Sequence, residues 1–61
     1  MFSIHLHPTA RVAALEFVSR YRGAAVQVAS SKIDALIAAN DVAGALEMDR
    51  VRREVLDILY A

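Results

Sequence analysis

The feature that most constrains the fold is the dipeptide Asn40-Asp41, which lies between two stretches with the apolar spacing of a helix. Asn accepts the left-handed backbone conformation that commonly ends a helix. Asp is a preferred N-cap, because its carboxylate accepts hydrogen bonds from the free amides of the next turn and complements the helix dipole. We therefore expect one helix to end at this corner and the next to begin directly after it.

Gly44 lies in the first turn after this corner, where the sequence otherwise favours a helix. Inside a helix, glycine costs roughly 1 kcal/mol relative to alanine. We interpret Gly44 as a packing residue, placed where the backbone of a neighbouring helix passes very close. The alternative is a functional role.

Apolar residues at three- and four-residue steps predict an all-α fold of three helices, 8–22, 24–39 and 42–59, in one small domain of residues 1–61. Gly23 is the predicted stop of the first helix, and the third helix has the clearest seam. The residues predicted to face the core are Ala10, Ala14, Phe17, Val18 and Tyr21, then Val26, Ala29, Ile33, Leu36 and Ile37, then Gly44, Met48, Val51, Val55 and Ile58.

Residues 1–7 alternate between apolar and polar side chains, a period typical of a half-buried strand. The apolar positions are Phe2, Ile4 and Leu6, and the polar positions are Ser3, His5 and His7. A lone strand has no partner in a helical chain, so we expect this extended segment to pair across a dimer. The alternative is a disordered tail.

The length and composition predict a thin core. A chain of 61 residues buries only about 60% of the surface that its unfolded form exposes. Hydrophobic residues make up 57% of the sequence, but twelve of them are alanines, which bury little apolar area each. With no cysteine to form a disulfide, self-association is the expected source of extra stability.

The sequence also suggests a compartment. The longest unbroken apolar run, residues 35–39, is far shorter than the roughly 20 residues that span a bilayer. The first residues do not show the basic and then apolar order of a secretory signal. Together with the absence of cysteine, these observations predict a cytoplasmic protein with no membrane association.

The two halves of the chain carry opposite charge, although the net charge is zero. Residues 1–32 hold four cations and one acid, which gives +3, and residues 33–61 hold three cations and six acids, which gives −3. One interpretation is a match to helix dipoles, with Arg20 and Arg22 at a helix C-terminus and Asp41 at an N-terminus. The other is head-to-tail attraction between subunits.

No set of side chains predicts catalysis or a cofactor. Asp49, Glu54 and Asp57 each have an arginine within helical reach, and the spacing favours the pairs Arg50–Glu54 and Arg53–Asp57. Such pairs predict ionised carboxylates rather than an acid with a raised pKa. Arginines interleaved with acids also argue against a basic surface for nucleic acid. We therefore expect neither an enzyme nor a nucleic-acid-binding protein.

A metal site is not expected either. His5 and His7 have a spacing that permits two zinc ligands, but no carboxylate or cysteine beside them completes a tetrahedral set. The alternative is a site of four imidazoles shared across a dimer.

A second apolar strip lies outside the seam of the third helix and consists of Val42, Leu46, Leu56 and Tyr60. A monomeric stack of three helices would leave this strip partly wet. We interpret the strip as a surface for a second subunit or another protein partner. The alternative is a broadening of the core.

Residues 29–36, residues 40–44 and Met48 resemble a family of short bacterial proteins of unknown function. In that family a helix reading Ala-x-x-Arg-x-x-x-Leu ends in Gly-Asp-x-x-Gly, with an aromatic residue four positions on. The similarity covers about residues 10–59, with Asn40 in place of the first Gly and Met48 in place of the aromatic residue. The resemblance implies an all-helical fold and no assigned activity.

The N-terminal half resembles a ribbon-helix-helix repressor, because residues 4–8 stand where those proteins have a short strand leading into a helix. The resemblance implies that two strands pair and that Ser3, His5 and His7 read base edges in the major groove. Histidine substitutes poorly for the usual readers, and a long third helix is not part of that fold. We therefore expect a non-enzymatic protein that acts through protein–protein interaction as a homodimer, with a DNA-binding regulator as the alternative.

Overall fold

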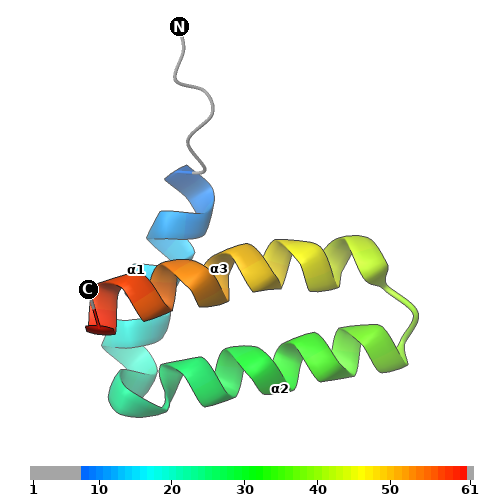
Figure 1. Ribbon diagram of the computed structural model, residues 1–61, viewed down its shortest axis with the longest axis horizontal. Helices are drawn as coiled ribbons and strands as arrows, with labels where there is room; N and C mark the ends of the chain where they lie inside the picture. Colours follow the sequence, from blue (N-terminus) through cyan, green and yellow to red (C-terminus); the bar gives the residue numbers. More distant parts are fainter. Residues whose placement is uncertain (1–7, 61) are drawn as a thin grey trace, which may run out of the picture.

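The computed structural model describes residues 8–60 and is all-helical over that range, with no strand (Figure 1). Within residues 8–60, only residues 39–41 fall outside a helix. The predicted all-α class is therefore confirmed for this part of the chain. The elements are α1 (Pro8–Tyr21), the 3-10 turn η1 (Arg22–Ala24), α2 (Ala25–Ala38) and α3 (Val42–Tyr60).

The predicted break at Gly23 is wrong. α1, η1 and α2 follow one another without a gap, so the described residues form two helical stretches, 8–38 and 42–60, and the chain changes direction within the first of them. The left-handed residue of this corner is Arg22, with a φ of 53°, and Gly23 has no positive φ. One left-handed residue redirects the chain, and a single 3-10 turn then carries it into α2.

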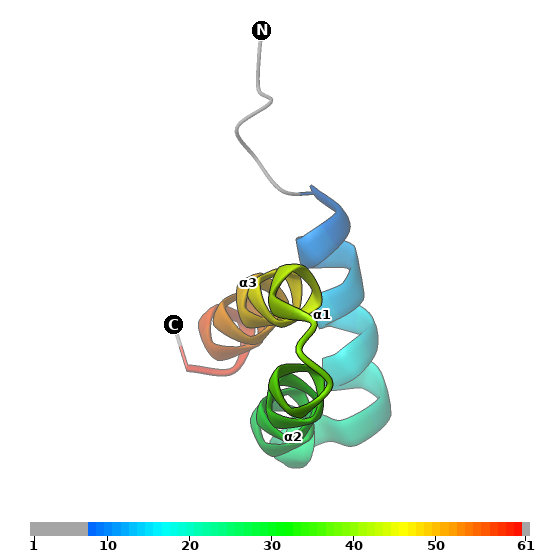
Figure 2. The ribbon, with the colours of Figure 1, turned by 90° about the vertical axis from the view of Figure 1, so that its right-hand side faces the viewer.

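The second helical run folds back on α2. Figure 1 shows α2 and α3 as an antiparallel hairpin, and Figure 2 shows α1 packed across one side of it. α1 crosses near the start of α2 and the end of α3, far from the corner that joins these two helices. α3 contacts both other helices extensively, whereas α1 and α2 touch each other at few positions. α3 is therefore the central element.

The Asn40-Asp41 corner forms as predicted. Asn40 has a left-handed φ of 62°, its N–H donates to the Ile37 carbonyl at 2.9 Å, and the Asp41 N–H donates to the Leu36 carbonyl at 2.8 Å. These two bonds constitute a Schellman motif, which satisfies carbonyls at the end of α2. The Asp41 carboxylate then accepts from the Gly44 N–H at 2.9 Å. Asp41 is thus the N-cap of α3.

The space beside Gly44 is filled by a side chain rather than by the helix backbone that was predicted there. A Cβ atom placed on Gly44 would lie 2.5 Å from Oδ2 and 2.9 Å from Cγ of Asp41, and its third nearest atom is also in that carboxylate. No helix backbone is among these nearest atoms. The glycine therefore leaves room for the capping side chain.

The core is thin, as the composition predicts. The buried hydrophobic residues are Ala10, Ala14, Ala25, Ala29, Ala45, Val51 and Val55. Val55 is the only large side chain among the described residues that is fully buried. Phe17, Tyr21 and Ile58 pack against this core while remaining partly exposed. The predicted faces of α1 and α3 are thereby confirmed.

Ile37 is an exception on α2. It was predicted to face the core, but 60% of its surface is exposed. Ile37 lies next to the corner, at the end of the hairpin that α1 does not reach. The predicted strand over residues 1–7, and with it the pairing of that segment across a dimer, lies outside the described residues.

Candidate functional site

The apolar strip predicted on α3 is exposed at both ends but is not continuous. Val42 and Leu46 are each 61% exposed and Tyr60 is 70% exposed, whereas Leu56 is half-buried. The two positions between Leu46 and Leu56 on this face are Asp49 and Arg53. These two side chains form an ion pair, with Arg53 Nε 3.0 Å from Asp49 Oδ2. The predicted strip therefore consists of two separate apolar areas.

The first of these areas belongs to a larger exposed region. Ile37, Val42 and Leu46 all lie at the corner end of the hairpin, and we call them the hairpin-end surface. A shallow hollow of about 340 Å³ lies close to this end, between α2 and α3. Its walls are mainly apolar and are formed by Lys32, Ala35, Leu36 and Met48. The corner end of the hairpin therefore exposes apolar side chains of both helices.

At the opposite end of the hairpin, a forked ion pair links α1 to α3, and the sequence did not predict it. Arg11 Nη1 donates to Glu54 Oε1 at 2.9 Å and to Asp57 Oδ2 at 3.0 Å. These hydrogen bonds, that of Glu54 first, raise the pKa of the Arg11 guanidinium above its ordinary value. The predicted pairs of Glu54 with Arg50 and of Asp57 with Arg53 do not form among the described residues. The opposite charges of the two halves thus attract within one chain.

Asp49 is the other strongly engaged acid on α3. Arg52 Nη2 lies 2.7 Å from Asp49 Oδ1, and Arg53 contacts the second carboxylate oxygen. The hydrogen bond from Arg52, together with both guanidinium charges, lowers the pKa of the Asp49 carboxyl. As predicted, Asp49 is a paired ion rather than a proton donor. Arg50 pairs with Glu47 at 2.8 Å.

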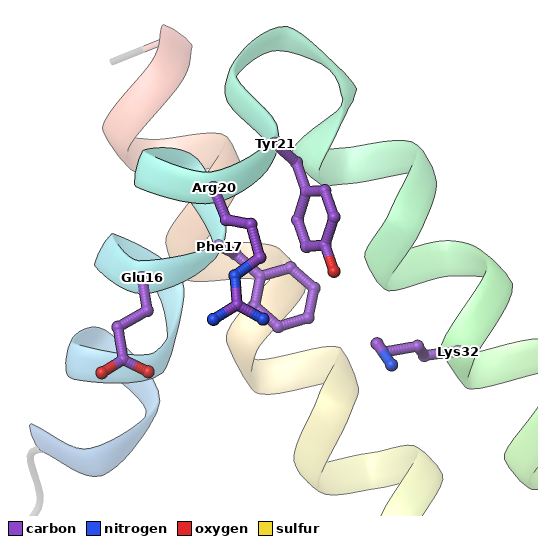
Figure 3. Close-up of a pocket in the computed structure, with 5 residues that line it drawn as sticks. All are labelled: Glu16, Phe17, Arg20, Tyr21 and Lys32. Carbon is purple, nitrogen blue, oxygen red and sulfur yellow. The ribbon is translucent and has the colours of Figure 1, made fainter.

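A second hollow, of about 210 Å³, lies between α1 and α2 on the inner side of η1 (Figure 3). Its wall includes Phe17 and Tyr21, whose rings meet edge to face with centroids 5.5 Å apart. Arg20 and Lys32 also line it, and Glu16 completes the rim. The sequence does not predict this group, because Lys32 is distant along the chain and only the corner at Arg22 brings it near α1.

The cations of this second hollow differ from those of α3. Within residues 8–60, neither Arg20 nor Lys32 has a carboxylate within 4.0 Å, although Glu16 is one turn from Arg20. Figure 3 shows the polar ends of Arg20, Tyr21 and Lys32 turned toward the shared space. The hollow therefore gathers hydrogen-bond donors beside an aromatic wall.

The remaining candidates are a metal site, the predicted base readers and a membrane-spanning helix. Among residues 8–60 no three His, Cys, Asp or Glu side chains come close enough to hold a metal ion. The predicted base readers Ser3, His5 and His7, and the four-imidazole site, lie outside the described residues. None of the described helices is both long and apolar enough to span a bilayer.

The comparisons with known proteins found no relative that indicates a function for this chain. No family model matches the chain, and no curated protein or solved structure is significantly similar to it.

Proposed function

We propose that this protein is a non-enzymatic cytoplasmic protein that acts by binding proteins, first of all a second copy of itself. The observation that carries the proposal is the hairpin-end surface. Ile37, Val42 and Leu46 each leave about three-fifths of their surface in water. Single exposed apolar residues are ordinary, but three large ones gathered at one end of a 61-residue chain favour a contact surface.

The thin core supports self-association in particular. In the part of the chain that the structure describes, five of the seven buried hydrophobic residues are alanines, so α1, α2 and α3 bury little apolar area against one another. Small domains with such cores commonly need disulfides, metals or oligomerisation. The chain has no cysteine, which leaves a second subunit as the source of added burial.

A two-fold dimer suits the shape of the hairpin. In a two-fold interface the same surface of each subunit meets its counterpart. Two hairpins that meet at their corner ends form a four-helix arrangement, which buries apolar side chains between facing helices. The ion-paired centre of α3, at Asp49 and Arg53, then lies at the polar rim of the contact.

The pairing of the acids supports a role without catalysis. Glu54 and Asp57 are engaged by Arg11, and Asp49 by two arginines. With the pair Arg50–Glu47, four of the seven cations in the sequence are ion-paired, which also favours a protein partner over nucleic acid.

Sedimentation equilibrium of the full chain and of two exposed-site variants tests the dimer. We expect the unchanged chain to be a dimer at micromolar concentration and Leu46→Glu to be a monomer, because a buried, unpaired carboxylate is costly. Val12→Glu is the matched control, since Val12 is 56% exposed on α1, and it should remain dimeric. A full chain that stays monomeric at high micromolar concentration would overturn the proposal.

The ribbon-helix-helix alternative is separated by a third variant, a chain that lacks residues 1–7. In that alternative the dimer depends on the N-terminal segment, so its removal should dissociate the subunits and Leu46→Glu should not. We expect Leu46→Glu to dissociate the subunits, and removal of residues 1–7 to weaken the dimer without abolishing it. We also expect affinity for duplex DNA no better than the non-specific range of about 10⁻⁴ to 10⁻⁶ M at physiological salt.

A further inference from the structure

The hollow between α1 and α2 has features that the dimer does not use. It lies beside η1, at the opposite end of α2 from the Asn40-Asp41 corner. Its volume of about 210 Å³ is too small for a helix and lies below the roughly 300 to 1,000 Å³ of pockets for drug-sized ligands. Any ligand it takes must therefore be small.

The charge of the hollow favours an anion. Arg20 and Lys32 bring two positive charges to its rim, and Glu16 brings one negative charge. The two cations repel each other, and no described carboxylate neutralises either of them. An anion placed between them would interact favourably with both, and a guanidinium group offers carboxylates and phosphates a planar pair of donors.

The walls of the hollow favour an aromatic ring on that anion. Phe17 and Tyr21 both line the hollow and meet edge to face, and a third ring can add to such a pair by offset or edge-to-face packing. Figure 3 shows the Tyr21 hydroxyl directed into the hollow, where it can donate to an oxyanion. The polar and aromatic groups thus lie on neighbouring parts of the same small space.

We propose that this hollow binds a small aromatic oxyanion, a ring that carries a phosphate or a carboxylate. The oxyanion lies between Arg20 and Lys32 and accepts from the Tyr21 hydroxyl. The ring packs against Phe17. The negative charge of Glu16 repels an anionic ligand and lowers its affinity.

An NMR titration of the ¹⁵N-labelled full chain tests this assignment at fixed ionic strength. The probes are phenyl phosphate, benzoate, inorganic phosphate and phenol. We expect phenyl phosphate and benzoate to shift the amides of residues 16–21 and 32, and to bind more tightly than either inorganic phosphate or phenol. Tighter binding of phenyl phosphate would assign the site to phosphate esters, and tighter binding of benzoate would assign it to carboxylates.

Charge variants then separate a site from general attraction. Arg20→Gln and Lys32→Gln should each weaken binding of the better probe by roughly two- to fivefold, the change expected for one exposed ion pair. Glu16→Gln should tighten it, which no loss of folding would do. Arg22→Gln is the matched control, because Arg22 is an exposed cation outside the hollow, and it should leave binding unchanged.

Two outcomes would overturn the proposal. If Arg22→Gln weakens binding as much as Arg20→Gln, the probes respond to net charge alone. If inorganic phosphate binds as tightly as phenyl phosphate, the aromatic wall contributes nothing and the ligand class is wrong.

Discussion

The two ends of the α2–α3 hairpin differ in how far their apolar side chains are buried. At the α1 end, Val51 and Val55 are buried beneath α1, and Arg11 links the helices through Glu54 and Asp57. At the corner end, local hydrogen bonds hold the backbone of residues 39–45, yet the hairpin-end surface is exposed. Local hydrogen bonding and apolar burial are therefore set separately in this fold, and the corner end has the first without the second.

The largest expected effect concerns two valines of α3, one at each end of the hairpin. Val55→Ala should lower the free energy of unfolding by roughly 2 to 3 kcal/mol, because it removes two methyl groups and leaves a cavity. Val42→Ala should change it by less than about 0.5 kcal/mol when the protein is dilute. Urea unfolding at one low protein concentration measures both. Equal losses at the two positions would mean that the two ends are packed alike.

A second prediction concerns the hydrogen bonds of the corner end. Asp41→Ala removes the acceptor of the Gly44 N–H and should lower the free energy of unfolding by about 1 kcal/mol. Asp41→Asn is the control and should retain nearly all of the stability, because Asn caps helices as well as Asp does. If the two variants lose the same amount, the cap does not stabilise the corner.

The corner end was also the part of the fold that the sequence predicted best. Asn40 and Asp41 act through bonds within six residues, and their preferences are strong enough to be recognised without the tertiary structure. The core faces of α1 and α3 were predicted for a similar reason, since the spacing of apolar residues follows the helix.

The predictions for Gly44 and Gly23 failed for local reasons, at Asp41 and Arg22, whereas the other failures depend on distant parts of the chain. The position of α1 across one end of the hairpin decides that Val55 is buried and Ile37 is exposed, and apolar spacing carries no such information. The same crossing gives Arg11 to Glu54 and Asp57 in place of the predicted partners on α3. The hollow beside η1 was not predicted, because Arg20 and Lys32 come near each other only through the tertiary fold.

A third prediction compares the two corners of the chain. Arg22→Gly should raise the free energy of unfolding by about 1 kcal/mol, because Arg22 holds a left-handed φ of 53° that only glycine adopts without cost. Gly23→Ala should also stabilise, by about 0.5 kcal/mol, since its φ is not positive and its Cβ would meet nothing within 4 Å. Thermal unfolding monitored by circular dichroism measures both changes. A loss of stability in Gly23→Ala would place the left-handed residue at Gly23 instead.

The smallest expected effect is the loss of stability at low pH that comes from the ion pairs of Asp49, in the middle of α3. Asp49 has a lowered pKa in the folded chain because of Arg52 and Arg53, so its ion pairs stabilise the fold above the ordinary aspartate pKa of about 3.9. That stabilisation is lost as the pH falls through the folded pKa. The midpoint of thermal unfolding should therefore fall more between pH 5 and pH 2 for the unchanged chain than for Asp49→Asn.

The control for this experiment is Asp34→Asn, because Asp34 makes no ion pair within residues 8–60. Its acid dependence should follow that of the unchanged chain. Identical slopes for Asp49→Asn and the unchanged chain would show that the arginines on α3 do not stabilise the ionised carboxylate.

Asp41 serves both helices of the hairpin at once. Its N–H donates to the last turn of α2, and its carbonyl and carboxylate accept from the first turn of α3. The connection therefore has no spare residue, and inserting even one amino acid there would uncouple one helix from the other. Gly23, whose surroundings are open, is the better place to lengthen this chain, and natural or designed insertions should be tolerated there first.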